Sequence, residues 1–169
     1  YLDAKDQRVD KPMDFRPKNR VSLVDLMRML AGVVLEPVQG APANFGLAPS
    51  DRAFLMQAMT EYPRQSKDPV YDPTKFGDGH VKYLLAGLVR VAPAAEWVIA
   101  NKIGMAYGFA TENAWVKHTP SGRSLFVAAT LYVNADEVLN DGKYEYQTIA
   151  LPYLADLGEA VGRVLLTAR

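Results

Sequence analysis

The residues Asn101-Lys102-Ile103-Gly104 have the types and the spacing that could bind or stabilise an anion. They end an apolar run that begins at Trp97, and a second glycine, Gly108, comes four residues after the first. In a strand, a lysine here would lie on the sheet surface, and the glycines would leave main-chain N–H groups open to a ligand. A cation beside open amides suits a bound anion or a developing oxyanion.

The same residues have plainer interpretations. Lys102 can be a solvated lysine at a strand end, and Gly104 and Gly108 can mark a bulge or a bend. Glu112 and Asn113 are expected to be ordinary polar residues of a strand. His118, beside a predicted turn, is expected to be exposed.

Composition restricts the class of protein. The chain has 169 residues, 49% of them hydrophobic and 22% charged, which predicts one globular domain. Basic and acidic residues both number 19, so nothing overall favours nucleic acid or an anionic membrane. The absence of cysteine excludes thiol catalysis, and the two histidines lack metal-ligand spacing, so we expect neither a metal nor another cofactor. No apolar run approaches the roughly 20 residues of a membrane span.

The order of predicted elements is that of an α+β fold. Residues 1–20 are charged and read as an irregular loop. Residues 21–92 are mainly helical, with helices from Ser22 and from Ser50, a buried stripe on the second that includes Phe54, and a short helix at about 81–88.

Residues 93–169 are predicted to form an antiparallel sheet and a terminal helix. The strands are expected at 96–103, 107–117 and 124–134, connected as a meander, and the helix at about 148–167 should pack on them. In that helix, Gly158 and Gly162 would allow a close approach to the sheet. We expect residues 1–169 to form a single but incomplete domain.

The third strand points to a missing partner. Residues 125–133 carry no charge on either face, as in a central strand that is covered on both sides. A three-stranded meander nevertheless places this strand at an edge. We therefore expect strand 124–134 to pair with an absent N-terminal half of the same protein or with a second copy. The alternative is that the final helix and its preceding loop cover the edge.

These features resemble the penicillin-recognising serine hydrolases, which comprise the class A β-lactamases and the related penicillin-binding proteins. Asn101-Lys102-Ile103-Gly104 stands where that family has a Lys-Thr-Gly or Lys-Ser-Gly motif at a strand end. Residues 107–116, 125–133 and 148–167 look like its following strands and closing helix. The resemblance begins at about residue 15 and rests on the order of elements more than on motifs.

The resemblance implies roles for particular residues. Lys102 would help to hold a substrate carboxylate, the Met105 amide would donate to an oxyanion, and Ile103, Gly104 and Tyr107 would line the substrate site. It also implies a peptide or β-lactam-like ligand and a periplasmic or secreted location.

The sequence also departs from the family. Ile103 lacks the family's hydroxyl, and no Ser-x-x-Lys or Ser-x-Asn motif occurs. We therefore expect the C-terminal part of a β-lactamase-like serine hydrolase, which supplies the Lys-x-Gly strand but not the nucleophile and is inactive alone. The alternatives are a non-catalytic domain of the same fold that binds a peptide or cell-wall fragment, and an unrelated α+β binding module.

Overall fold

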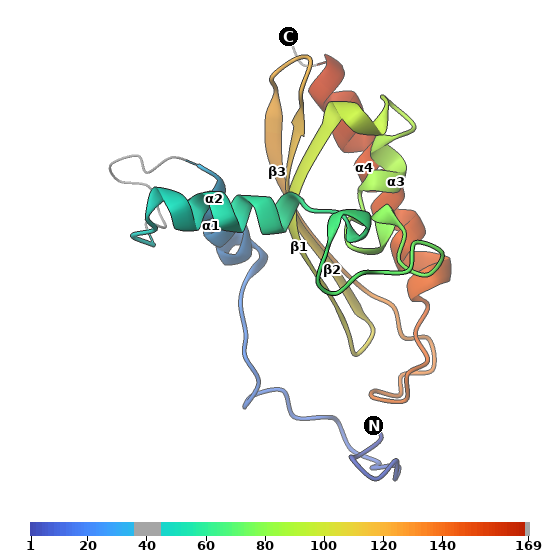
Figure 1. The fold of residues 1–169 in the computed structure, drawn as a ribbon. Coiled ribbons are helices and arrows are strands. Elements are labelled where there is room, and N and C mark those ends of the chain that lie inside the picture. The colour runs from blue at the N-terminus through green and yellow to red at the C-terminus, as the bar shows by residue number, and fades with distance from the viewer. Residues whose placement is uncertain (36–44, 168–169) are drawn as a thin grey trace.

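The centre of the fold is a three-stranded antiparallel sheet with the order β1-β2-β3. Its strands are β1 (Trp97–Ala106), β2 (Phe109–His118) and β3 (Ser124–Tyr132). The computed structural model describes residues 1–35 and 45–167, and helices lie against both faces of the sheet (Figure 1). The predicted α+β arrangement, with a meander followed by a C-terminal helix, is confirmed.

Helices α1 (Leu23–Val34) and α2 (Pro49–Thr60) pack on one face of the sheet. Helix α1 begins where the sequence predicts, because the Ser22 hydroxyl accepts a hydrogen bond of 3.0 Å from the Asp25 N–H. The expected buried stripe of α2 is wrong: none of its residues is fully buried, and Phe54 is 68% exposed.

Helices α3 (Leu85–Leu88) and α4 (Leu151–Thr167) pack on the opposite face. A π-helical turn, Tyr146–Ala150, leads into α4, and short 3-10 turns occupy Pro63–Gln65, Asp78–His80 and Ala94–Glu96. The helix expected at 81–88 is therefore shorter than predicted. The main core lies between these helices and the sheet and contains Leu84, Leu85, Leu88, Trp97, Ile99, Ala114, Val116, Val161 and Leu165.

Two glycines allow α3 and α4 to touch. A Cβ on Gly87 would lie 1.6 Å from the Ala155 carbonyl oxygen, and one on Gly158 would lie 2.1 Å from that of Leu84. The close approach that the glycines of α4 allow is thus with the α3 segment rather than with the sheet, which corrects the prediction.

A two-residue turn, Tyr107-Gly108, joins β1 to β2. Both residues have left-handed backbone conformations, with φ of 53° and 83°. Such a turn closes on a hydrogen-bonded pair, here Ala106 and Phe109, and hydrogen-bonded pairs then recur at every second residue. The turn thereby fixes which backbone groups of β1 bond β2 and which do not.

The register leaves the outer edge of β1 with open backbone groups. Lys102 and Gly104 fall in pairs that bond β2, whereas Ile103 and Met105 fall in the alternate pairs. The N–H and C=O groups of Ile103 and Met105 consequently point out of the sheet.

The outer edge of β3 is open in the same way. The backbone groups of Phe126, Ala128 and Thr130 point away from β2, and no strand within residues 1–35 and 45–167 pairs with them. No residue of β3 is fully buried, although α1 packs against one face. A partner that covers this edge stays a prediction.

The N-terminal segment runs along the far end of the molecule (Figure 1). Residues 1–20 form no helix and pair only through a bridge between Leu2 and Arg8, in agreement with the predicted irregular loop. The Leu2 N–H donates to the Leu139 carbonyl at 2.9 Å, and the Phe15 ring meets the Tyr107 ring edge-on at 5.6 Å. The segment is thus anchored to the loop after β3 and to the β1–β2 turn.

Candidate functional site

Lys102 is exposed on the face of the sheet that α1 and α2 cover. It pairs with Asn113, whose side-chain amide donates to the Leu26 carbonyl of α1 at 2.9 Å. Directly paired residues project to the same face, so Lys102 also points to the helical side. Its ammonium has no hydrogen-bond or ion-pair partner among the described residues. This cation is therefore free to meet an anion.

Met105 presents the second feature that the sequence predicts. Its side chain is 37% exposed, and its amide N–H points out of the edge of β1 as the register requires. The amide of Ile103 points the same way. The free ammonium and the outward amides are thus carried by one stretch of an edge strand.

The other predicted site residues have different surroundings. The Ile103 side chain packs against a second buried cluster, whose members include Tyr83 and Leu154. Gly104 lies in regular strand, where the nearest atom to an added Cβ would be 3.9 Å away. Tyr107 lies in the turn, so the second strand begins two residues later than predicted.

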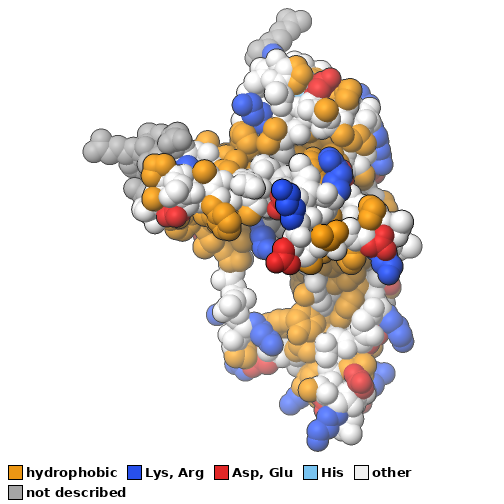
Figure 2. Space-filling model, viewed as in Figure 1, with side chains coloured by type: hydrophobic (Ala, Val, Ile, Leu, Met, Phe, Trp, Pro, Cys, Tyr) orange, Lys and Arg blue, Asp and Glu red, His pale blue; other side chains and the backbone are white. Residues whose placement is uncertain are grey.

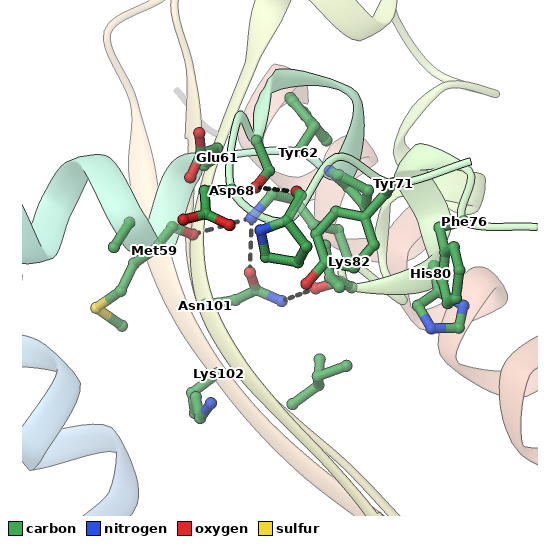
Figure 3. Close-up of a pocket in the computed structure, with 16 residues that line it drawn as sticks. Met59, Glu61, Tyr62, Asp68, Tyr71, Phe76, His80, Lys82, Asn101 and Lys102 are labelled. Carbon is green, nitrogen blue, oxygen red and sulfur yellow. Dashed lines mark hydrogen bonds between the residues drawn. The ribbon is translucent and has the colours of Figure 1, made fainter. Parts of the chain in front are cut away.

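A cavity of about 540 Å³ lies at the outer edge of β1 (Figure 3). The end of α2, the loop 61–81 and β1 enclose it. Lys102 and Ile103 line it, whereas Gly104, Met105 and Tyr107 do not. The structure therefore brings only part of the predicted site to one cavity wall.

A buried polar cluster, which the sequence analysis did not predict, lies beneath β1. The Lys82 ammonium donates to Asn101 Oδ1 at 2.8 Å and to the Met59 carbonyl at 2.9 Å. Asn101 Nδ2 in turn donates to Glu112 Oε1 at 2.7 Å, and the Tyr83 N–H donates to Glu112 Oε2 at 2.8 Å. Asn101 thus connects a buried cation to a buried carboxylate.

Burial shifts the acidity of both charged members of this Lys82–Asn101–Glu112 cluster. Lys82 is 1% exposed, and loss of hydration lowers its pKa to about 8 against the opposing charges of Glu112 and Asp78. Glu112 is fully buried, and the same effect raises its pKa to about 7 despite hydrogen bonds from Asn101 and the Tyr83 backbone. The cluster therefore holds titratable groups close to neutral pH.

The sequence contained a signal for this cluster. Asn101 and Glu112 point inward. Asn101 lies on the same face of β1 as the buried Ile99, and Glu112 lies on the same face of β2 as the buried Ala110 and Ala114. A polar residue at an inward position requires a buried partner. The expectation that Glu112 is an ordinary strand residue overlooked this pattern.

His118 is buried rather than exposed, which corrects a second expectation. It is 5% exposed, with Nε2 at 3.0 Å from Glu96 Oε2 and Nδ1 at 2.9 Å from Ser121 Oγ. Its ring also lies 4.8 Å from that of Trp97. These contacts connect the β2–β3 turn to the start of β1.

Charge on the visible surface is mixed. On the face shown in Figure 2, acidic and basic side chains are interspersed among hydrophobic ones, in keeping with a net charge of zero. Within residues 1–35 and 45–167, no group of three or more potential metal-ligating side chains occurs. No helix of that part of the chain has both the length and the apolar character needed to cross a membrane.

Comparisons with models of protein families, with curated proteins and with solved structures find no match to this chain.

Proposed function

We propose that this chain is the C-terminal part of a serine hydrolase of penicillin-recognising type. The observation that carries the proposal is the edge of β1, where the free ammonium of Lys102 is followed three residues later by the outward amide of Met105. An acyl-transfer site needs a cation for the substrate carboxylate and an N–H donor for the oxyanion, and this edge offers both.

The nucleophile comes from elsewhere in this proposal. The chain has no Ser-x-x-Lys sequence, so another segment of the protein or another chain supplies the serine. The open edge of β3 supports such a complement, because unpaired strand edges are usually covered or blocked. Export to the periplasm or secretion belongs to the same proposal and rests on the family resemblance alone.

Lys102 and Met105 would act by electrostatics. The ammonium would attract the substrate carboxylate and favour the anionic transition state. Removal of a single oxyanion donor typically lowers kcat by about 100- to 1,000-fold.

One observation favours a second candidate, a non-catalytic domain that binds a peptide or cell-wall fragment. Ile103 stands where the family has a hydroxyl, and its side chain packs against the core instead of offering a hydrogen bond. A site without that hydroxyl can retain binding through Lys102 and the open amides while lacking hydrolysis.

The experiment that separates the two candidates uses the native gene product. Its intact mass and its reaction with a fluorescent penicillin are measured beside those of the chain 1–169. The first proposal expects a longer product with Ser-x-x-Lys that becomes covalently labelled, and no labelling of residues 1–169 alone. A native product that lacks the motif and stays unlabelled would support the binding domain instead.

A further inference from the structure

The cavity at the edge of β1 has properties of a small-molecule site, and apart from Lys102 and Ile103 its lining residues have no part in the proposed acyl-transfer chemistry. Its volume of about 540 Å³ falls within the roughly 300–1,000 Å³ that ligand pockets occupy. Figure 3 shows aromatic side chains and charged side chains drawn around the same space. The question is which ligand these walls fit.

One wall of the cavity is aromatic. The rings of Tyr71 and Phe76 meet edge-on at 5.3 Å, and the ring of His80 continues the row at 5.0 Å from Phe76. Tyr62 lines the cavity near the end of α2. Such rings favour a ligand with an aromatic group, because aromatic pairs attract one another in edge-to-face and offset arrangements beyond what their burial contributes.

Two lysines, Lys82 and Lys102, line the cavity. Lys82 donates two of its three ammonium hydrogens, to Met59 and Asn101, and the Tyr62 ring centroid lies 5.4 Å from its nitrogen. The third hydrogen has no acceptor oxygen among the described residues. Lys102, which projects from the opposite face of β1, adds a second ammonium that is unpaired among the described residues.

Two acidic residues also line the cavity. Glu61 and Asp68 line it, and neither carboxylate has an ion-pair or hydrogen-bond partner among the described residues. An ammonium and carboxylates that line one cavity and are unpaired among the described residues match a molecule that carries both charges.

We propose that this cavity binds a small aromatic zwitterion, of which an aromatic α-amino acid is the simplest example. The ligand carboxylate faces Lys102, its ammonium faces Glu61 and Asp68, and its ring packs against Tyr71 and Phe76. This inference does not depend on membership of the chain in a serine hydrolase.

The test compares three probes that share one ring and differ in charge. Phenylalanine, 3-phenylpropionate and 2-phenylethylamine are titrated into the 169-residue chain, and amide chemical shifts are followed. We expect saturable shifts in the loop 61–81 and in β1 with phenylalanine, and at least about tenfold weaker binding of either singly charged probe, equivalent to about 1.4 kcal/mol. Equal affinities for the three probes, or no saturation with phenylalanine at about 10 mM, near the limit of measurable affinity, would overturn the proposal.

A charge variant sharpens the test without touching the core. Asp68 is exposed, so Asp68→Asn should fold normally. It should weaken phenylalanine binding at least tenfold, by the same arithmetic about 1.4 kcal/mol, while leaving 3-phenylpropionate unchanged. The matched control is Asp72→Asn, an exposed acid of the same loop that does not line the cavity. The proposal is wrong if the two variants bind phenylalanine equally well.

Discussion

Two lysines on either side of the same strand have opposite environments. Lys82 lies beneath β1 with 1% exposure and is held by Asn101, whereas Lys102, the residue after Asn101, is exposed and unpaired among the described residues. Successive residues of a strand point to opposite faces, so one step along the chain separates a structural cation from one available to a ligand. Charge type alone therefore does not identify the functional lysine.

The largest expected difference between the two sides is in stability. Lys82→Met should lower the free energy of unfolding by about 3 kcal/mol, because it leaves the Glu112 carboxylate without a nearby cation and two buried oxygens without a donor. The matched variant Lys102→Met should change it by less than about 0.5 kcal/mol. Urea denaturation of both variants measures the two values. Similar losses would show that the two lysines do not differ as described.

The backbone of β1 offers a second contrast, within four consecutive residues. The amides of Lys102 and Gly104 bond β2 and should exchange with solvent slowly, while those of Ile103 and Met105 point outward and should exchange at least about tenfold faster, a difference of about 1.4 kcal/mol in opening free energy. Hydrogen exchange followed by NMR resolves these positions. Uniform protection of all four amides would mean that the outer edge is covered.

The buried cluster should also make stability depend on pH in an unusual way. Glu112 has a folded pKa of about 7, above its ordinary value of 4.5, so the folded state holds a proton that the unfolded state releases. Its contribution to stability is therefore lost as the pH rises from about 4.5 to about 7. Lys82 has a folded pKa of about 8, below its ordinary 10.5, so its contribution returns as the pH rises from about 8 to about 10.5.

The contribution of Glu112 and Lys82 to the free energy of unfolding is therefore expected to be smallest between about pH 7 and pH 8. The difference in urea midpoint between the wild type and Glu112→Gln, measured from pH 5 to pH 7, isolates the carboxylate. As the pH rises, the urea midpoint of the wild type should fall relative to that of the Glu112→Gln variant. A constant difference across that range would contradict the raised pKa of Glu112.

The sequence predicted the order of the strands, and the turn between the last two was marked by Gly122, which adopts left-handed backbone; the turn at Gly108 was instead assigned to a strand. The exposure of Lys102 was expected because a lysine within a strand should lie on the sheet surface. The sequence did not predict the exposure of α2, since helical periodicity says which residues share a face but not what covers that face.

The buried cluster was harder to predict because its members come from different elements. Asn101 and Glu112 could have been found from their inward positions on β1 and β2. Lys82 lies 19 residues before Asn101, in a turn with no periodicity, so only the folded chain brings the two together. The burial of His118 likewise depends on Glu96, which is distant along the sequence.

The central claim is that Lys102 and the open edge of β1 form part of an acyl-transfer site. The most direct measurement is the rate at which a fluorescent penicillin acylates the native gene product and its Lys102→Met variant, at equal folded fractions. The account predicts a reactive wild type and a variant that reacts at least about tenfold more slowly, a change of about 1.4 kcal/mol in the barrier. Equal rates in the two proteins, or a native product that does not react at all, would contradict it.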